Sequence, residues 1–350
     1  MSTPFRVGIS PDFYTDLKGR FEAVIEEHLA RVPGIEVHPM PPQPGKRATA
    51  EGLKAFDAVL ALGLRITAES LEGVHRLAVV ARWGVGYDTI DVAALTRAGV
   101  ALALTPRAVR RPVAEAILTF VFALAKNLME QDRLVRSGRW RDELSRLGRN
   151  LDALVLGSVG CGNIAREMFR LARPLGFRRL LACDPYVRAE EVAELGVQLT
   201  TLETVLSESD IVTVNVPLTE ETRGMIGEGE LRRMKPSAWL INTARGGVVD
   251  QEALRRALGE RWIAGAGIDV FPSEPPAQDD PLLALDNVIL TPHALAWTEE
   301  LVRDVGTEAC ANILAVARGE APPGLLNRPV LDEPGFQAKL ARLRAAKRSS

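Results

Sequence analysis

Short runs of apolar residues alternate with segments of helical apolar spacing over roughly the first hundred residues. The apolar runs predict buried strands at residues 5–9, 35–37, 58–62, 77–82 and 100–104. Apolar residues three or four positions apart predict helices at 21–30 and 92–98. Strands that alternate with helices are typical of a parallel sheet with helices on its faces. We therefore expect an α/β domain here, interrupted by a proline-rich surface loop at 39–47.

The same alternation returns between residues 151 and 293 with a more regular spacing. The apolar runs predict about six parallel strands, at residues 154–159, 180–184, 211–216, 239–243, 263–270 and 288–291. Such a sheet, with helices between its strands, is doubly wound. Two long helices are predicted beside it, at 112–138 and 297–319. A loop-like segment, 321–331, then leads to a basic, helix-compatible tail at 336–350, which we expect to be a solvated end.

A glycine-rich turn follows the first strand of this second series. The turn and the predicted start of the next helix comprise Gly160, Gly162, Asn163 and Ile164, and the next strand ends on Asp184. Strand, G-x-G-x-x-A turn, helix, strand and acid in this order are the pattern of a dinucleotide-binding unit. The phosphates would lie on the free N–H groups at the start of the helix. Asp184 would accept hydrogen bonds from the adenosine ribose and repel a 2'-phosphate, which favours NAD over NADP.

Three later strands are followed by side chains that can do chemistry. The strand at 239–243 leads to Arg245. The strand at 263–270 contains Asp269 and leads to Glu274, and the strand at 288–291 leads to His293. Ligands of an open parallel sheet bind beyond the carboxyl ends of its strands. These side chains would therefore face the same crevice as the glycine turn. Singly, each has a structural explanation, such as a surface ion pair or a helix cap; their joint occurrence favours an active site.

Composition and charge limit the choice of partners. The 350 residues suffice for two domains, and a net charge of −2 gives no reason to expect nucleic acid or an anionic membrane as a partner. The apolar stretch at 116–125 is too short to span a bilayer, and the N-terminus lacks the pattern of a signal peptide. Cys161, Cys183 and Cys310 lack the spacing of a metal site, so we expect no metal, free thiols and a cytoplasmic location.

Six motifs occur in a fixed order between residues 82 and 327. They are RWGVGYDTID at 82–91, VGCGNIA at 159–165, DIVTVNVPLTEETRGMI at 210–226, INTARGGVVD at 241–250, GIDVFPSEPP at 267–276 and NVILTPHALAWTEE at 287–300. Together they resemble the D-isomer-specific 2-hydroxyacid dehydrogenase family. The resemblance implies an NAD-dependent oxidoreductase that interconverts a 2-oxo acid and its D-2-hydroxy acid. It also implies a homodimer, and we expect the helix after Pro112 to supply the interface.

The resemblance further implies that Arg245, Glu274 and His293 are the catalytic residues. Reduction of a 2-oxo acid requires a proton at the carbonyl oxygen, and an imidazole, which titrates near neutral pH, can give and take that proton. His293 would be this acid and base, and Glu274 would fix the tautomer of its ring. Arg245 would bind the carboxylate and the carbonyl of the substrate, a task that suits a planar guanidinium.

Other residues are assigned to binding by the same resemblance. Besides the glycine turn and Asp184, the cofactor set comprises Val216, Pro217, Thr243, Ala244, Arg245, Asp269 and His293. For Asp269, a place near the nicotinamide and a buried capping role both remain open. The substrate set comprises Val85, Gly86, Arg245 and His293. The N–H groups of the GVGYD loop at 84–88 would bind the substrate carboxylate, with a plain tight turn as the alternative.

The implied architecture has two α/β domains. A flavodoxin-like substrate domain would comprise residues 1–106 and 297–330, a Rossmann-type NAD-binding domain residues 107–296, and a C-terminal tail residues 331–350. Arg107, Arg110 and Arg111 depart from the family pattern, and they are either solvated or contacts for a second anionic group of the substrate. Two other functions remain open on this fold, an NADH-sensing scaffold and a dehydrogenase of the formate or phosphite type.

Overall fold

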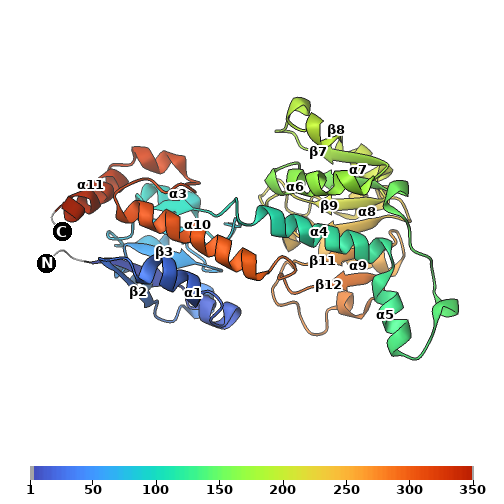
Figure 1. The fold of residues 1–350 in the computed structure, drawn as a ribbon, viewed down its shortest axis with the longest axis horizontal. Helices are drawn as coiled ribbons and strands as arrows, with labels where there is room; N and C mark the ends of the chain where they lie inside the picture. Colours follow the sequence, from blue (N-terminus) through green and yellow to red (C-terminus); the bar gives the residue numbers. More distant parts are fainter. Residues whose placement is uncertain (1–3, 349–350) are drawn as a thin grey trace. The chain divides into compact units, whose positions relative to one another are not determined.

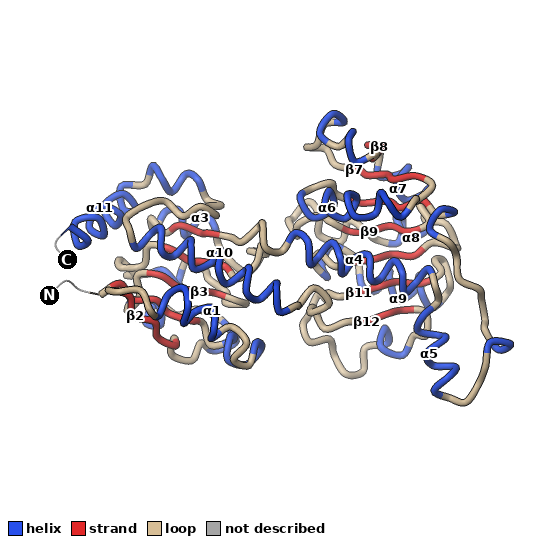
Figure 2. The backbone as a smooth tube through the Cα atoms, viewed as in Figure 1, coloured by secondary structure: helices blue, strands red, loops and turns tan. Residues whose placement is uncertain are grey.

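The computed structural model describes residues 4–348, which fold into two compact units. The central unit comprises Arg110–Trp297, and the terminal unit is built from the chain before it, up to Val109, and the chain after it, from Thr298. Each unit contains one parallel β-sheet with helices packed against it (Figure 1). Figure 2 distinguishes the strands from the helices and from the loops that join them.

The sheet of the terminal unit has five parallel strands in the order β2-β1-β3-β4-β5. They are β1 (Phe5–Ile9), β2 (Ile35–Pro39), β3 (Ala58–Ala61), β4 (Val79–Arg82) and β5 (Ala101–Ala103). Each strand coincides with a predicted apolar run to within about two residues at either end. The strand order is that of flavodoxin-like folds, so the predicted fold of this part of the chain is confirmed.

The helices of the terminal unit are less regular than the apolar pattern predicts. They are α1 (Glu22–Ile25), α2 (Ala50–Lys54), α3 (Val92–Arg97), α10 (Glu299–Ala317) and α11 (Pro334–Arg348), with 3-10 turns η3 (Pro44–Lys46), η4 (Glu69–Leu71) and η12 (Arg328–Asp332). The helix predicted at 21–30 continues after α1 as a π-helix, η2 (Glu26–Ala30), and a second π-helix, η1 (Phe13–Leu17), lies where the pattern predicts none. Val24, Ile25 and Leu29 are nevertheless buried, so the predicted apolar face does pack inward.

The sheet of the central unit has seven parallel strands in the order β12-β11-β10-β9-β6-β7-β8. They are β6 (Val155–Val159), β7 (Arg179–Cys183), β8 (Val197–Leu199), β9 (Ile211–Val214), β10 (Trp239–Asn242), β11 (Gly265–Ile268) and β12 (Val288–Leu290). Numbered from β6, this is the 3-2-1-4-5-6 order of a doubly wound Rossmann-type sheet, with β12 added. The fold class is therefore confirmed. The prediction of about six strands misses β8, a short edge strand in which Val197 alone is buried.

Helices cover both faces of the central sheet. They are α4 (Arg110–Ala125), α5 (Leu128–Arg136), α6 (Asn163–Ala172), α7 (Leu202–Glu208), α8 (Glu228–Arg233) and α9 (Gln251–Gly259), with 3-10 turns η5 (Arg141–Glu143), η6 (Leu151–Ala153), η7 (Arg173–Leu175), η8 (Ala189–Glu191), η9 (Ala193–Leu195), η10 (Gly246–Val248) and η11 (Pro281–Ala284). Leu154 and Leu156 pack with α4 and α6, which lie side by side in Figure 1. Val155 and Val159 point the other way and pack with α7, α8 and α9. Because both faces are buried, the loops at the strand ends are the part of the sheet that remains open to a ligand.

The single long helix predicted at 112–138 is wrong. The chain instead forms α4 and α5, whose axes are bent by 61°. Asn127 between them adopts the left-handed conformation, with φ 53° and ψ 39°, which asparagine tolerates better than most side chains. Its amide donates to the Glu130 carboxylate and, at 3.2 Å, to the carbonyl of Arg146. Contacts with a later segment thus hold the bend.

In the part of the chain that the structure describes, no single helix is both long and apolar enough to cross a membrane; α4 and α5 meet that criterion only together, across their bend.

The C-terminal segment is packed, which contradicts the expectation of a solvated end. α11 buries Phe336, Leu340 and Leu343 within the terminal unit. The Arg342 guanidinium of the same helix donates to Asp57 at 2.8 Å, and Asp57 is 1 % exposed. The apolar residues do follow a helical spacing, but the lysine and the arginine between them make the segment resemble a solvated helix when it is considered without the surface on which it packs.

Candidate active site

The three side chains predicted to act in catalysis follow three neighbouring strands of the central sheet. β10, β11 and β12 pair in parallel, and the residues in register near their carboxyl ends are Asn242, Ile268 and Leu290. Arg245, Glu274 and His293 lie in the loops that begin directly after these positions. Parallel strands direct their carboxyl ends to one rim of the sheet. The central unit therefore brings all three residues to the same rim.

His293 and Glu274 form a direct pair. Nδ1 of His293 lies 3.0 and 2.8 Å from the two carboxylate oxygens, and the backbone N–H of Phe271 donates to Oε1 of Glu274 at 3.0 Å. Burial alone would raise the pKa of Glu274, but the hydrogen bonds from His293 and Phe271 and the charge of Arg245 hold that pKa below its ordinary value. An ionised carboxylate can only accept. Nδ1 of His293 therefore carries a hydrogen, and Nε2 is left to exchange a proton with a ligand.

Close backbone packing holds the loop of Arg245 against the loop of Glu274. A Cβ on Gly246 would lie about 1.4 Å closer to the carbonyl carbon of Phe271 than the 3.4 Å at which ordinary van der Waals contact begins. Only glycine allows this approach. The buried side chain of Asn242 shapes the same turn, because Nδ2 donates to the carbonyl of Arg245 and Oδ1 accepts from the N–H of Ala244, both at 3.0 Å.

Asp269 holds the loop that carries His293. Its side chain is 4 % exposed, and Oδ1 accepts from the Thr291 hydroxyl at 2.5 Å and from the N–H groups of Ala294 and Leu295 at 3.1 and 3.2 Å. His293 lies between these donors with a φ of 54°, a conformation that is uncommon outside glycine. The buried capping role considered for Asp269 is thus present in the structure, and it acts on the loop of the histidine.

The glycine turn at the end of β6 has the geometry of a phosphate-binding loop. Gly160 has a φ of 93°, and a Cβ there would lie 2.5 Å from the carbonyl oxygen of Asn215. A Cβ on Gly162 would meet no atom within 4 Å, so this residue faces open space. Ile164 packs against the apolar core, and the helix that begins at Asn163 has no side-chain cap. The first N–H groups of α6 are therefore available to an anion.

Asp184 follows β7 and contacts the glycine turn directly. Its Oδ2 accepts from the N–H of Cys161 at 2.8 Å, and its Oδ1 accepts from the N–H of Tyr186 at 2.9 Å. The residue is partly exposed, and each carboxylate oxygen has a second lone pair. Asp184 thus fixes the turn and keeps acceptor capacity for the hydroxyls of a ribose.

The remaining residues of the predicted cofactor set follow β9 and β10 at the same rim. They are Val216, Pro217, Thr243 and Ala244. Val216 packs against the core, and its side chain lies beside Gly160. Oγ1 of Thr243 is buried and, within residues 4–348, has no hydrogen-bond partner. Buried hydroxyls are nearly always paired, so this oxygen is a candidate contact for a bound ligand.

The predicted substrate loop lies in the terminal unit, directly after β4. Gly84 has a φ of 121°, its N–H donates to the hydroxyl of Thr105 at 3.0 Å, and its carbonyl accepts from the N–H of Thr105 at 3.1 Å. Val85 and Gly86 follow, and both are partly exposed. Among the residues described, their N–H groups donate no hydrogen bond. The loop thus presents the free donors that binding of a carboxylate would need.

The three arginines that depart from the family pattern have different surroundings. Nε of Arg107 lies 3.4 Å from Glu308, and Arg111 lies 3.7 Å from Glu167. Nε of Arg110 is buried and has no partner among residues 4–348. Ion pairs within the protein thus account for Arg107 and Arg111 without a second anionic group on a substrate.

Comparison with known proteins places the chain in a family. Residues 118–294 match the family model described as D-isomer specific 2-hydroxyacid dehydrogenase, NAD binding domain. The chain is 42 % identical over 319 residues to the glyoxylate reductase of Korarchaeum cryptofilum. The aligned residues cover 89 % of this chain and 95 % of that protein. The chain belongs to the D-isomer-specific 2-hydroxyacid dehydrogenase family. The resemblance predicted from its motifs is confirmed, and with it an oxidoreductase that acts on 2-hydroxy acids and 2-oxo acids with a nicotinamide cofactor.

Other members of the family show the same relationship. The glyoxylate reductase of Pyrococcus furiosus is 41 % identical over 296 residues, which are 82 % of this dehydrogenase and 87 % of that protein. The crystal structure of D-lactate dehydrogenase from Aquifex aeolicus, complexed with NAD and lactic acid, has a TM-score of 0.78 at 27 % identity and covers 90 % of this chain and 96 % of that chain. The similarity thus extends over both units.

The residues of this dehydrogenase fit a nicotinamide dinucleotide. The open space at Gly162 and the uncapped start of α6 suit its pyrophosphate, and the unpartnered hydroxyl of Thr243 lies at the same rim. Asp184 retains acceptors for a ribose. When bound, this cofactor supplies the hydride.

Sequence reasoning misses the residues that place the catalytic groups. Gly246 was visible as part of the GG pair after Arg245, but its contact with Phe271 depends on a loop 25 positions later. Asn242 lies inside an apolar strand and gives no signal of its role in the turn. These contacts are set by the tertiary fold and not by spacing along the chain.

Proposed function

We propose that this dehydrogenase reduces glyoxylate or another small 2-oxo acid with NADH, and that it does so with Arg245, Glu274 and His293. The observation that carries the proposal is the hydrogen-bonded pair of His293 and Glu274, on the same sheet rim as Arg245 and the glycine turn. Relatives that are about 40 % identical are glyoxylate reductases, which makes glyoxylate the first substrate to test.

In the proposed reaction, the protein positions the substrate and supplies the proton. Nε2 of His293 donates a proton to the carbonyl oxygen as the hydride reaches the carbonyl carbon, and in the reverse direction it removes that proton. Glu274 accepts from Nδ1 and stabilises the charged ring. Arg245 binds the carboxylate and the carbonyl oxygen, and its charge favours the oxygen that becomes negative. Hydride and proton together convert the 2-oxo acid into the 2-hydroxy acid.

We assign the binding of the two ligands to different parts of the chain. The central unit acts as the NAD-binding domain, through the glycine turn, Asp184, the segments after β9 and β10, and Asp269. The terminal unit acts as the substrate domain, through the N–H groups of Val85 and Gly86. Asp184 makes NADH the preferred cofactor, because its carboxylate would repel a 2'-phosphate.

Turnover and cofactor binding test the proposal separately. Purified enzyme is supplied with NADH and with glyoxylate, hydroxypyruvate, pyruvate or 2-oxoglutarate, and NADH consumption is followed by absorbance. We expect turnover with at least one of them. His293→Ala should abolish turnover and leave the dissociation constant of NADH nearly unchanged. Absence of turnover by the wild type, or loss of NADH binding in the variant, would contradict the assignment.

We further propose that the enzyme is a homodimer. α5, which Figure 1 labels, and the segment after it carry exposed apolar side chains. Leu147 is the most exposed of them, at 81 %. The others in this part of the chain are Leu128, Met129, Val135 and Trp140. A second copy of the chain would remove this patch from water. Light scattering should give the mass of a dimer for the wild type, and Trp140→Glu combined with Leu147→Glu should reduce it; a monomeric wild type would refute this assignment.

We also propose that the enzyme works in the cytoplasm. Its cysteines, Cys161, Cys183 and Cys310, are all free thiols. Thiols of this kind are typical of a reducing compartment, where NADH is also available. Fractionation of the native cells should recover the activity with the cytoplasmic proteins, and recovery outside the cytoplasm would contradict the proposal.

A further inference from the structure

We propose that Arg82 positions the loop that binds the substrate carboxylate, an inference that rests on the proposed function. Arg82 is the last residue of β4, directly before the loop. Its Nε donates to the carbonyl of Gly86 at 2.8 Å, and its Nη1 donates to the carbonyl of Trp83. A Cβ on Gly84 would lie 3.7 Å from Nη1. The guanidinium thus lies against the loop and links the carbonyl just before it to a carbonyl in its middle.

The loop is held on its other sides as well. Gly84 exchanges hydrogen bonds with Thr105, and beyond the loop the carbonyl of Thr89 accepts from the N–H of Ile66 at 3.0 Å. Among residues 4–348, the N–H groups of Val85, Gly86 and Tyr87 donate no hydrogen bond. Carbonyl oxygens in the loop therefore face the protein, while a run of consecutive N–H groups is left for a ligand. Consecutive free N–H groups in a turn form a concave site for anions.

Arg82 controls the direction of these donors. The carbonyl and the N–H of one trans peptide point in opposite directions. When the guanidinium holds the carbonyl of Gly86, it turns the N–H of Tyr87 away from itself and leaves this donor free for a ligand. The guanidinium also adds a positive charge next to these dipoles, which favours a carboxylate. A lysine in its place would keep the charge, but a single ammonium lacks the planar fork that spans two carbonyls.

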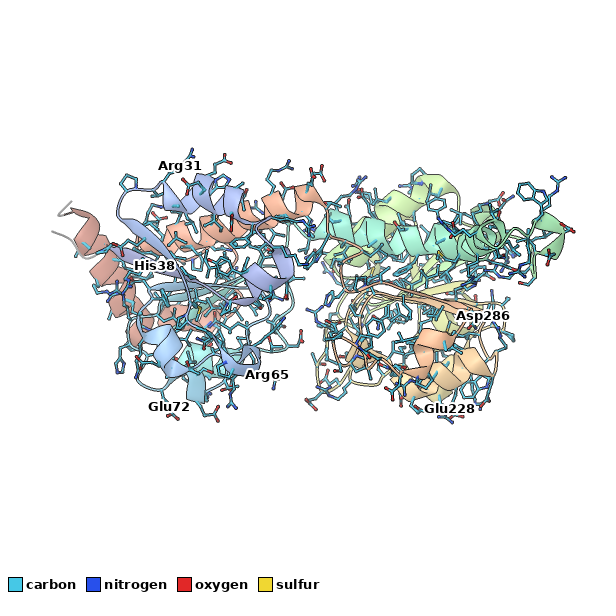
Figure 3. All side chains as sticks on the ribbon, turned by 90° about the horizontal axis from the view of Figure 1, so that it is seen from below. Arg31, His38, Arg65, Glu72, Glu228 and Asp286 are labelled. Carbon is cyan, nitrogen blue, oxygen red and sulfur yellow. The ribbon has the colours of Figure 1, made fainter. Side chains whose placement is uncertain are left out.

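The test compares Arg82→Met and Arg82→Lys with the control Arg65→Met. Arg65, labelled in Figure 3, is an exposed arginine of the same unit in the segment next to the loop, and its side chain makes none of the contacts of Arg82. The control therefore removes the same charge without freeing the loop. Each protein is assayed with NADH and a 2-oxo acid, and with the neutral amide of that acid. Calorimetry measures the binding of oxamate, an unreactive carboxylate analogue, to the enzyme with NADH present.

Both Arg82 variants should raise KM for the acid and weaken oxamate binding about tenfold or more. The reason is that the loop would bind the carboxylate equally in the ground state and in the transition state. KM for the amide, the NADH dissociation constant and the Arg65→Met enzyme should stay within about twofold of the wild type. Unchanged oxamate binding in Arg82→Lys, or an equal loss in Arg65→Met, would overturn the proposal. If Arg82→Met fails to fold, Arg82→Lys decides. Oxamate binding reports on Arg82 without turnover, so a wild type that consumes no NADH refutes the proposed function and not this inference.

Discussion

Replacement of Gly246 by alanine should push the loop of Arg245 away from the loop of Glu274. The new methyl group would lie about 1.4 Å too close to the carbonyl carbon of Phe271, which is backbone and cannot rotate away. Overpacking of this kind costs about 1–3 kcal/mol of folding free energy, or roughly 2–4 °C of Tm per kcal/mol for a unit of this size. A shift of about 1 Å between catalytic groups reduces activity on the order of a hundredfold. The larger effect should therefore be on kcat/KM.

Gly247→Ala is the matched control for this change. A Cβ on Gly247 would meet the methyl groups of Leu218 at 3.2 and 3.3 Å, and a side-chain end of this kind can move. The assay measures kcat/KM with NADH and glyoxylate, NADH binding by fluorescence, and Tm for the two variants and the wild type. Gly246→Ala should lose activity at nearly unchanged NADH affinity, while Gly247→Ala stays within a few-fold of the wild type. Full activity in Gly246→Ala, or equal losses in both, would show that this backbone contact does not place the catalytic groups.

Four further outcomes are expected. Asp269→Ala should lower kcat about tenfold or more, because three partly buried donors of the histidine loop lose their acceptor; Asp269→Asn, which keeps an amide oxygen, should recover part of the lost kcat in steady-state assays. Because the pKa of Glu274 is held below its ordinary value of 4.5, the midpoint of any loss of rate from its protonation should lie below pH 4.5 in a pH-rate profile. Glu274→Gln should lower kcat at neutral pH, by as much as about 10⁴-fold. Burial alone would raise the pKa of Asp210, but the N–H of Val155 and the charges of Lys235 and Arg149 hold that pKa below 3.8. This carboxylate therefore stabilises the fold above pH 3.8 and does so less as the pH falls. Asp210→Asn should lower the free energy of unfolding in urea by about 1–3 kcal/mol at pH 7, and the same difference at pH 7 and below pH 3.8 would contradict this reasoning. Asp184→Ala should narrow the preference for NADH over NADPH in kcat/KM, and an unchanged ratio would count against its assigned contact with the ribose.

Features that depend on local sequence were predictable, and features that depend on distant contacts were not. The strand predicted at 58–62 was placed correctly because a fully buried strand needs an unbroken apolar run, and all four residues of Ala58–Ala61 are buried. His293 was placed at the sheet rim because ligands bind beyond the carboxyl ends of parallel strands. The bend at Asn127 was missed, since it is stabilised by a carbonyl 19 positions later. The hydrogen bonds of Arg82 could not be predicted either, because they depend on the conformation of the loop. The sequence indicated only that the loop after Arg82 binds the substrate.

The strands of the terminal unit are synthesised before the central unit, yet α10 and α11, which complete the terminal unit, are synthesised after it. Asp57 can form its ion pair with Arg342 only after the 285 residues that follow it, up to Arg342 itself, have been translated. The central unit is continuous in sequence, so it can fold during that interval, while the nascent β1–β5 sheet still lacks the helices α10 and α11. Slow translation or a truncated message would therefore endanger the early strands, and chaperones that bind exposed apolar segments should recognise this part of the newborn chain.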